Sequence, residues 1–180
     1  MYQTYQQIII RDAVPADAPQ LCKWWNDGSV MAHAGFPKGL GTTEEKILRQ
    51  ISDRSRKHYL HVILYEGRLI GEMNYRETAP ETCEIGIKIC DASMQNRGLG
   101  KLILSLFISA LFEECGYQKI ILDTNLTNLR AQHVYEQLGF RKLRVNIDSW
   151  IDQLGRPQSS VDYELTKDTF ISYLAPPGAE

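Results

Sequence analysis

The stretch Gln95-Asn96-Arg97-Gly98-Leu99-Gly100 lies between an apolar run, Ile85–Cys90, and a helix-forming sequence that begins at Lys101. It therefore predicts a strand, a short glycine-bearing loop and a helix. The first amides of a helix lack intrahelical acceptors, and the helix dipole adds partial positive charge at the same end. Because Gly98 and Gly100 have no Cβ, a ligand can approach this backbone closely. The pattern indicates a phosphate site, although on spacing alone a simple tight connection explains it equally well.

This loop is neither a dinucleotide-binding motif nor a P-loop. Ile103 occupies the place of the third glycine in the pattern G-x-G-x-x-G, and the Gly-Lys-Ser/Thr signature of a P-loop does not follow a first glycine. Arg97 and Lys101 add formal positive charge beside the start of the helix. The loop therefore belongs to a different anion-binding motif.

The composition is that of an ordinary globular chain. Its 180 residues suit one domain, 1–180, of which we expect about 175–180 to form a disordered tail. A net charge of -2 gives no general attraction to nucleic acid or membranes, and the basic run 54–58 is too short to change this. No apolar run approaches the ~18 residues of a membrane span, and the polar N-terminus is not a signal peptide. We therefore expect a cytoplasmic protein with no nucleic-acid or membrane partner.

The cysteines and histidines indicate neither a disulfide framework nor a metal site. No two of the 4 cysteines form a C-x-x-C pair, and the 4 histidines are scattered along the chain. We expect buried free thiols in a reducing compartment, and no bound metal. The residues concerned are Cys22, Cys83, Cys90, Cys115, His33, His58, His61 and His133.

Hydrophobic periodicity in the N-terminal half predicts two helices and several strands. The helix Ala16–Trp25 is followed by a glycine-rich segment, Val30–Gly41, which is typical of a long loop or a broken helix. Thr42, with Glu45 three residues later, is the better capping-box match for a second helix that runs to about Arg56. The predicted strands are Ile8–Arg11, His58–Tyr65, Arg68–Arg76 and Thr82–Cys90, the last three forming an antiparallel meander with a tight turn at Glu66-Gly67.

Helices and strands alternate in the C-terminal half. Because a helix separates the last strand of the meander from the next buried strand, these two strands are predicted to be parallel. The final two strands should form a hairpin, so the whole chain is predicted to be one α+β domain. The elements are a helix at Gly98–Cys115, a strand at Lys119–Thr124, a helix at Leu129–Leu138, and strands at Phe140–Asp148 and Ser160–Leu165.

Two motifs in this order resemble the GCN5-related N-acetyltransferase (GNAT) superfamily. Gln95, Gly98 and Gly100 match its pyrophosphate loop, Gln/Arg-x-x-Gly-x-Gly/Ala, and Asn128–Phe140 matches its helix pattern Asn-x-x-Ala-x-x-x-Tyr-x-x-x-Gly-Phe. The resemblance extends over nearly the whole chain and is nearest in pattern to the ribosomal-protein alanine and polyamine acetyltransferase branches. It implies a mixed, mostly antiparallel sheet of about seven strands flanked by about four helices. It also implies direct transfer of an acetyl group from acetyl-CoA to a primary amine in a ternary complex.

Carried over residue by residue, the resemblance implies a cofactor site and a catalytic acid. The end of the third meander strand should hold the pantetheine arm through its backbone, and the amides of the glycine loop should hold the pyrophosphate. Asn128 should hydrogen-bond the pantetheine region, although it could be only a helix N-cap. Tyr135 should protonate the departing thiolate, although outside the motif a core aromatic is the better interpretation. The cofactor-binding residues are then Lys88, Ile89, Cys90, Gln95, Asn96, Arg97, Gly98, Leu99, Gly100, Lys101 and Asn128.

Several residues compete for the role of general base. Glu84 begins a strand where several GNAT enzymes carry a base, and it is the leading candidate, but it could equally pair with Lys88 or point to solvent. Glu72 and His33 are weaker candidates. Cys90 could be an acyl carrier, but its place at a strand end favours a packing role.

The front half of the chain should form the acceptor cleft in such a fold. Aromatic residues with acidic neighbours suit a cationic amine, which fits a protein N-terminus, a polyamine or an aminoglycoside-like molecule. The candidate residues are Trp25, His33, Phe36 and Tyr75, although Trp24 and Trp25 could simply pack a helix. A catalytically silent acetyl-CoA sensor is the alternative function, and the resemblance leaves room for a homodimer.

Overall fold

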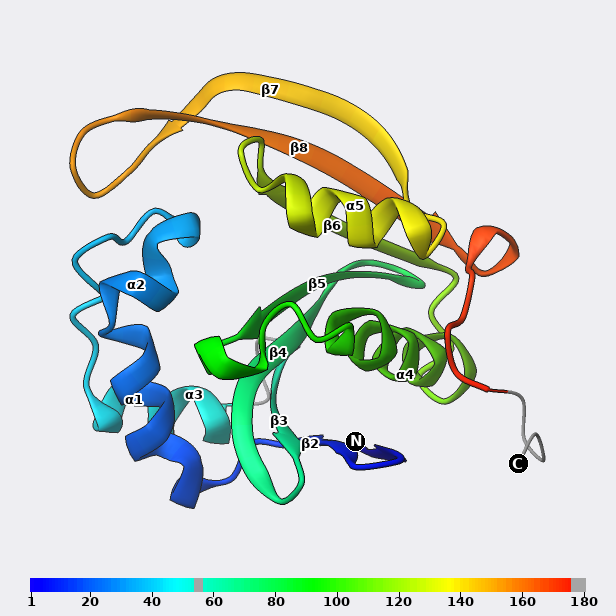
Figure 1. The fold of residues 1–180 in the computed structure, drawn as a ribbon, viewed down its shortest axis with the longest axis horizontal. Helices are drawn as coiled ribbons and strands as arrows, with labels where there is room; N and C mark the ends of the chain where they lie inside the picture. The colour runs from blue at the N-terminus through cyan, green and yellow to red at the C-terminus, as the bar shows by residue number, and fades with distance from the viewer. Residues whose placement is uncertain (54–56, 176–180) are drawn as a thin grey trace.

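The computed structural model describes residues 1–53 and 57–175, which form one mixed sheet with helices against it (Figure 1). The sheet has eight strands in the order β1-β2-β3-β4-β5-β6-β8-β7, and every neighbouring pair is antiparallel except β5 and β6. The predicted α+β class and the predicted parallel pair are confirmed. The predicted tail, about 175–180, lies outside the described residues except for Ala175, whose backbone amide donates to the Tyr5 hydroxyl at 3.0 Å. The strands are β1 (Tyr2–Tyr5), β2 (Ile8–Asp12), β3 (His58–Tyr65), β4 (Arg68–Ala79), β5 (Thr82–Ile89), β6 (Lys119–Asn125), β7 (Arg141–Ile151) and β8 (Pro157–Thr166).

The outermost strand, β1, is missing from the sequence prediction, so the sheet has one strand more than expected. It forms a hairpin with β2 through a tight turn in which Gln6 has a φ of 51°. Its sequence, Tyr-Gln-Thr-Tyr, is polar, but tyrosine and threonine are good strand formers and suit a half-exposed edge. This strand forms one edge of the sheet, and β7 forms the other.

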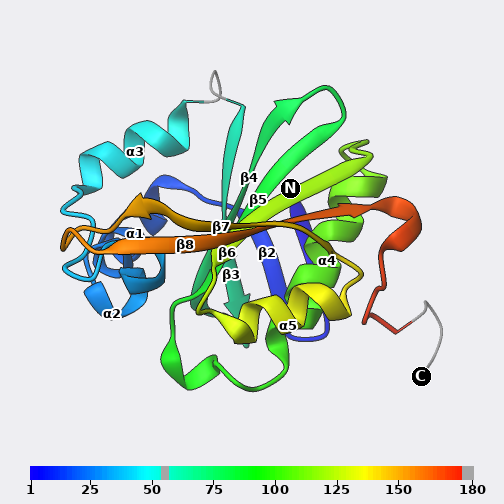
Figure 2. The ribbon, with the colours of Figure 1, turned by 90° about the horizontal axis from the view of Figure 1, so that it is seen from above.

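Three helices, α1 (Ala18–Trp25), α2 (Gly28–Met31) and α3 (Glu44–Ser52), gather on one side of the molecule in both Figure 1 and Figure 2. Together with side chains of β3 they bury a small apolar core that includes Leu21 and Val62. The predicted broken segment is therefore confirmed as the short helix α2 followed by a loop.

The N-terminus of α3 begins one residue later than predicted. Its cap is Thr43, whose Oγ1 accepts a hydrogen bond from the Lys46 amide at 3.4 Å. The prediction of Thr42 is wrong because the backbone amide and carbonyl of Thr42 are bonded to the Asn26 side chain, at 2.8 and 2.9 Å. The helix ends at Ser52, before the predicted end, which lies outside the described residues.

Two further helices, α4 (Leu99–Glu113) and α5 (Leu129–Gln137), lie on the other side of the molecule (Figures 1 and 2). Most residues of α4 are buried, and Phe107 and Leu111 lie at the centre of the main core. Both helices match their predicted positions closely. With α2, the described residues contain one α-helix more than the sequence predicted.

The strands β5 and β6 separate along their length. They pair only between Thr82–Glu84 and Lys119–Ile121. Beyond these residues β5 continues to Ile89 beside β4, and β6 continues to Asn125 beside β8. Beyond Glu84 and Ile121, the facing edges of β5 and β6 are no longer hydrogen-bonded to each other. A ligand can fill the gap between them as an added strand would.

The β7–β8 hairpin reaches across to the loop that follows α2 (Figure 1). Gln153 at its tip donates from its amide to the Gly35 carbonyl at 2.9 Å and from Nε2 to the Gly39 carbonyl at 3.0 Å. Gly35 has a φ of 91°, and an added Cβ would lie 2.4 Å from the Trp150 ring, so only glycine fits there. The hairpin and the α2 loop therefore hold each other in place.

No helix within the described ranges is both long and apolar enough to cross a bilayer. The four cysteines are free thiols, and Cys115 is exposed. Among the same residues no group of three or more histidine, cysteine, aspartate or glutamate side chains is placed to hold a metal ion.

Candidate active site

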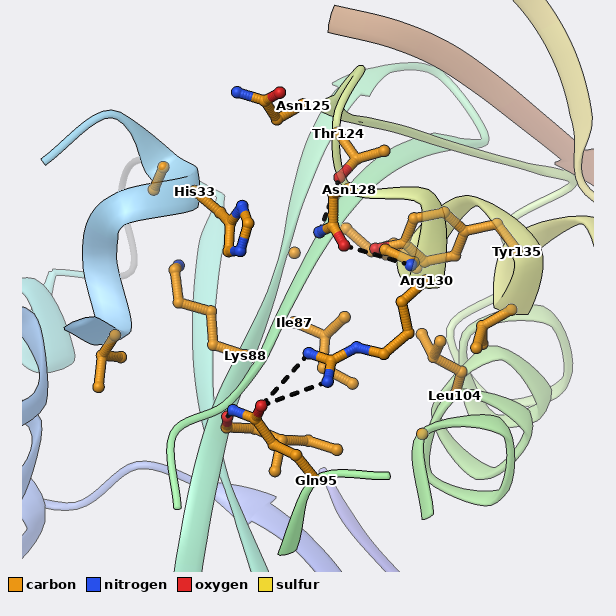
Figure 3. Close-up of a pocket in the computed structure, with 18 of the residues that line it drawn as sticks. His33, Ile87, Lys88, Gln95, Leu104, Thr124, Asn125, Asn128, Arg130 and Tyr135 are labelled. Carbon is orange, nitrogen blue, oxygen red and sulfur yellow. Dashed lines mark hydrogen bonds between the residues drawn. The ribbon is translucent and has the colours of Figure 1, made fainter. Parts of the chain in front are cut away.

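A cavity of about 680 Å³ opens at the gap between β5 and β6. Its walls come from α2, β5, the loop before α4, the first turn of α4, β6, α5 and the β7–β8 hairpin. Figure 3 shows side chains from these separate elements converging on it. The residues predicted from the sequence that line it are His33, Glu84, Lys88, Ile89, Gln95, Asn96, Gly98, Leu99, Gly100, Asn128 and Tyr135.

The loop before α4 brings the helix N-terminus to the cavity. Asn96 and Gly98 have positive φ angles of 60° and 77°, and no side chain caps the first amides of α4. A Cβ added at Gly98 or Gly100 would meet nothing within 4 Å apart from neighbouring residues of the loop and of α4 itself. At Gly100 the backbone does not require glycine, so the missing side chain leaves open space in front of the amides. This is the geometry of an anion site.

Gln95 and Arg130 connect the loop to both walls of the cavity. Gln95 Nε2 donates to the Ile89 carbonyl at 2.9 Å, and Arg130 Nη1 on α5 donates to Asn96 Oδ1 at 3.1 Å. The same Arg130 nitrogen donates to Gln95 Oε1 at 3.3 Å (Figure 3). Arg130 was not predicted, although it is a cation close to Asn128 in the second motif. It adds positive charge over the glycine loop.

The open edge of β5 presents the backbone of Ile87 and Ile89, although the Ile89 carbonyl already accepts a hydrogen bond from Gln95. The Cys90 amide donates to a β4 carbonyl at 2.8 Å, and the Lys88 carbonyl also faces β4, where it lies 2.2 Å from a Cβ added at Gly71. Backbone groups of successive strand residues point to opposite edges, so Ile87 and Ile89 face the gap. The Cys90 amide and the Lys88 carbonyl therefore point at β4 and not at the gap, which disfavours the predicted backbone contacts of these two residues, while the contact with Ile89 stays a prediction.

Cys90 is a packing residue. Its side chain is 8% exposed, its thiol donates to the Lys88 carbonyl at 3.6 Å, and it does not line the cavity. Burial, and then the negative charge of Glu72, raise the pKa of the Cys90 thiol to about 12. A thiol that stays protonated is a poor nucleophile, which agrees with the packing alternative and not with an acyl carrier.

The helix α5 carries Asn128 and Tyr135 to the cavity (Figure 3). Asn128 Oδ1 accepts the Ala131 amide at 3.3 Å, so this residue caps the helix and lines the cavity at the same time. The Tyr135 side chain is 8% exposed and packs against two core aromatic rings. Burial, and then the negative charge of Asp123, raise the pKa of Tyr135 to about 12. Tyr135 is therefore a core aromatic and also a protonated O–H donor beside the cavity.

Two carboxylates, Glu84 on β5 and Asp123 on β6, line the cavity. Glu84 is held by Arg76 at 2.6 Å, so the alternative in which Glu84 pairs with Lys88 is wrong. The sequence analysis did not single out Asp123. Asp123 is exposed at the mouth of the gap, but partial desolvation there, followed by the negative charges of Glu84 and Asp162, raises the pKa of Asp123. This carboxylate is thus prepared to accept a proton.

Lys88 enters the cavity from β5 and extends toward the side of His33 (Figure 3). Its Nζ lies 3.0 Å from Oε1 of Glu72, whose side chain is 1% exposed. The negative charge of Glu72 raises the pKa of Lys88, so the lysine stays charged. Glu72 does not line the cavity, and the prediction that it could serve as a base is not supported by its position behind Lys88.

Three of the four predicted acceptor residues lie outside the cavity. Trp25 is buried in the small core beside α2, which is the packing alternative, and Phe36 packs against the same core. Tyr75 lies in the main core beside α4, because side chains alternate along β4 and its neighbour Asn74 lines the cavity instead. Of the four, His33 is the one that the fold brings to the cavity.

The side chains of Arg97 and Lys101 also lie outside the cavity. Arg97 Nη1 contacts the Met94 sulfur at 3.3 Å, and Lys101 Nζ lies 4.5 Å from the centre of the Tyr173 ring. The predicted cofactor contacts of these two residues therefore concern their backbone amides alone.

Comparison with known proteins gives a family match. A family model described as an acetyltransferase (GNAT) domain matches residues 7–141. A search of curated proteins gives no match.

Several solved structures share the fold. Spermidine N-acetyltransferase from Vibrio cholerae, in complex with CoA and spermine, is 19% identical, with a TM-score of 0.80 over 91% of this chain and 97% of that one. RimL, a ribosomal L7/L12 α-N-protein acetyltransferase in complex with coenzyme A, is 14% identical, with a TM-score of 0.81 over 94% and 99% of the two chains. A GNAT-family acetyltransferase from Bacillus anthracis is 20% identical, with a TM-score of 0.75 over 93% and 99%.

Proposed function

Because the chain belongs to the GNAT acetyltransferase family, whose cosubstrate is acetyl-CoA, we propose that the β5–β6 cavity is its active site for N-acetylation. One observation carries the proposal: the open edge of β5, the uncapped start of α4 and the Tyr135 side chain meet at a single cavity. The β5 edge can pair with a peptide-like arm, and the start of α4 can bind a pyrophosphate. The Tyr135 side chain is an O–H donor at the place where a thiolate would leave.

The cosubstrate would lie along the gap. The amides from Asn96 to Lys101 would bind its pyrophosphate, with the open space at Gly98 and Gly100 allowing close approach. The backbone of Ile87 and Ile89 would pair with the pantetheine arm as a neighbouring strand would. Arg130 would supply the formal charge that backbone amides lack.

The chemistry follows from the thioester. A neutral amine attacks the carbonyl carbon, the C–N bond forms, and the C–S bond breaks. Tyr135 stays protonated at neutral pH because its pKa is raised to about 12, so it can give its proton to the departing sulfur. No nucleophilic cysteine takes part in such a direct transfer.

The acceptor side of the cavity carries charges of both signs. Glu84 is level with Ile121 in the last parallel pair. Lys88 lies four residues beyond Glu84 and Asp123 two residues beyond Ile121, so Lys88 is about 7 Å further along the strand direction than Asp123. An acceptor with one ammonium group and a nearby oxygen, such as the α-amino end of a peptide, satisfies both groups. A polyamine would bring a further ammonium group toward the charged Lys88, which is unfavourable. We therefore place a peptide N-terminus before a polyamine as the acceptor.

Release of free thiol from acetyl-CoA tests the proposal, with an unblocked alanyl peptide and spermidine as acceptors. We expect turnover with the peptide and a kcat about 10²-fold lower in Tyr135→Phe, because that variant loses the proton donor. Tyr163→Phe is the matched control, since its hydroxyl bonds Glu136 at 2.9 Å and does not line the cavity.

Two outcomes would count against this function. Binding of coenzyme A without turnover on any amine favours the silent sensor. Equal loss of activity in Tyr135→Phe and Tyr163→Phe would remove Tyr135 as the acid. A preference for spermidine over the peptide would contradict the acceptor class alone. The double variant Lys88→Met with Glu72→Gln removes both charges of the pair and so leaves no uncompensated buried charge. In this variant the ratio of kcat/KM for the peptide to kcat/KM for spermidine should be smaller than in the unmodified chain.

A further inference from the structure

Asp123 occupies a particular place in the sheet. Glu84 and Ile121 form the last pair before β5 and β6 separate, and Asp123 follows Ile121 by two residues. Residues i and i+2 of a strand share a face, so Asp123 and Glu84 lie on the same face at the mouth of the gap. Both line the cavity.

The charged neighbours of Asp123 are already engaged with other residues. Glu84 on β5 is paired with Arg76 of β4 at 2.6 Å. Asp162, directly opposite Asp123 on β8, is paired with Arg144 of β7 at 2.9 Å. Within residues 1–53 and 57–175, no salt bridge joins a cationic side chain to Asp123. Asp123 is exposed at the mouth of the gap, so its carboxylate is accessible to a bound acceptor amine.

Tyr135 approaches the same gap from α5. The charge of Asp123 contributes to raising the pKa of Tyr135, so the two side chains lie within electrostatic reach. Asp123 extends from the sheet face that also carries Glu84 and Asp162, whereas Tyr135 belongs to the main core beneath the opposite face. A proton acceptor and a proton donor thus stand on the two sides of the place where the thioester would lie.

We infer that Asp123, and not Glu84, is the general base that deprotonates the acceptor amine, an inference that rests on the proposed acetyl transfer. An ammonium group gives one proton to the Asp123 carboxylate, and its freed lone pair attacks the thioester carbonyl. As the C–S bond breaks, Tyr135 gives its proton to sulfur and regains one from the nitrogen. One proton stays on the new amide, one leaves with the thiol, and the proton on Asp123 passes to solvent.

Glu84 is the less suitable base because its carboxylate is tied to Arg76. A base must have lone pairs free for the incoming proton, and an ion pair favours the charged carboxylate. Asp123 lies between two negative groups, and no cationic side chain of the described residues is paired with it. Partial desolvation at the mouth of the gap and these two like charges also raise the pKa of Asp123, which makes its carboxylate a stronger base.

The test compares Asp123→Asn with Glu84→Gln, using acetyl-CoA and the unblocked alanyl peptide between pH 6 and pH 10, and following kcat/KM by thiol release. We expect Asp123→Asn to lower kcat/KM at pH 7 by about 10²-fold or more, and Glu84→Gln to lower it by less than about tenfold. The loss in Asp123→Asn should shrink as the pH rises, because more of the free amine is then already neutral. Asp123→Glu, which keeps a carboxylate, should recover part of the activity.

The affinity for coenzyme A, measured by calorimetry, separates this inference from the proposed function. It should be unchanged in both variants, which also shows that they are folded. Absence of binding or turnover in the unmodified chain overturns the proposed function together with the inference. A functional unmodified chain whose Asp123→Asn variant keeps full activity, or whose Glu84→Gln variant loses more, overturns the inference alone. So does a loss in Asp123→Asn that stays constant with pH.

Discussion

The two sides of the β5–β6 gap are built from different parts of the chain. The side of α4 and α5 is mainly backbone: a strand edge, a glycine loop and a helix N-terminus. The side of α2 and the β7–β8 hairpin is mainly side chains that meet only after folding, such as Lys88, Asp123 and Trp150. We infer that the cosubstrate and the acceptor are recognised by separate structures. A mutation on one side should therefore change the affinity for one substrate and leave the affinity for the other unchanged.

The largest effect on the cosubstrate side is expected from Gly100→Leu. A Cβ at this position contacts nothing within 4 Å outside its own stretch of α4, so the side chain has room to extend into the cavity, and the protein should remain stable while the ligand is excluded. We expect coenzyme A to bind about 100-fold more weakly, or about 2.7 kcal/mol.

Calorimetric titration and thermal unfolding check this prediction together. Ala92→Leu is the control, because Ala92 is exposed and lies just outside the cavity. Unchanged affinity in Gly100→Leu would mean that the glycine loop is only a tight connection.

On the acceptor side the matching change is Trp150→Ala. Trp150 lines the cavity and packs against Gly35, so its loss should loosen the contact between the hairpin and the α2 loop. The KM for the acceptor should rise about tenfold, which is about 1.4 kcal/mol, while the KM for acetyl-CoA stays the same. Initial rates with each substrate varied in turn measure this, with Leu154→Ala at the exposed hairpin tip as control. A rise in both KM values would show that the two sides are coupled.

A smaller effect is expected from Arg130→Gln. This change removes a cation that holds Gln95 and Asn96, but leaves the backbone amides in place. Coenzyme A should bind about fivefold more weakly at low ionic strength, and the difference should decrease as salt screens the charge. Titrations at two salt concentrations measure it, with Arg68→Gln, which removes an exposed arginine outside the cavity, as control. A loss that does not depend on salt would indicate a purely structural role.

The smallest effect concerns stability. Folding raises the pKa of Asp123, so its charged form is disfavoured in the folded state, and this penalty is present at neutral pH. Asp123→Asn should therefore raise Tm at pH 7 by on the order of 1 °C, and the gain should vanish as the pH falls through the raised pKa. Asp162→Asn, which loses the contact with Arg144, should lower Tm instead. A lower Tm in Asp123→Asn would show that the carboxylate is held by favourable contacts.

The residues that line the cosubstrate side could be named from the sequence because two local motifs resemble those of the GNAT superfamily, while spacing alone left a tight connection equally open. Gly98 and Gly100 mark the loop, Asn128 marks the start of α5, and helix periodicity brings Tyr135 to the same face. Spacing did not reveal which backbone groups of β5 are free, because that depends on the register with β4.

The acceptor side could be predicted only in small part. Trp25 and Tyr75 were predicted to bind the acceptor because aromatic rings suit a cationic amine. Both side chains are instead buried in the two cores. Asp123 and Trp150 carried no local signal, because their places depend on the separation of β5 from β6 and on the docking of the hairpin. Both are tertiary features.

The central claim is that the cavity between β5 and β6 binds coenzyme A through the start of α4. Calorimetric titration of coenzyme A into the unmodified chain tests it most directly. We predict one site per chain with a Kd on the order of 10 µM, weakened about 100-fold by Gly100→Leu. No heat of binding up to about 1 mM coenzyme A would contradict the account.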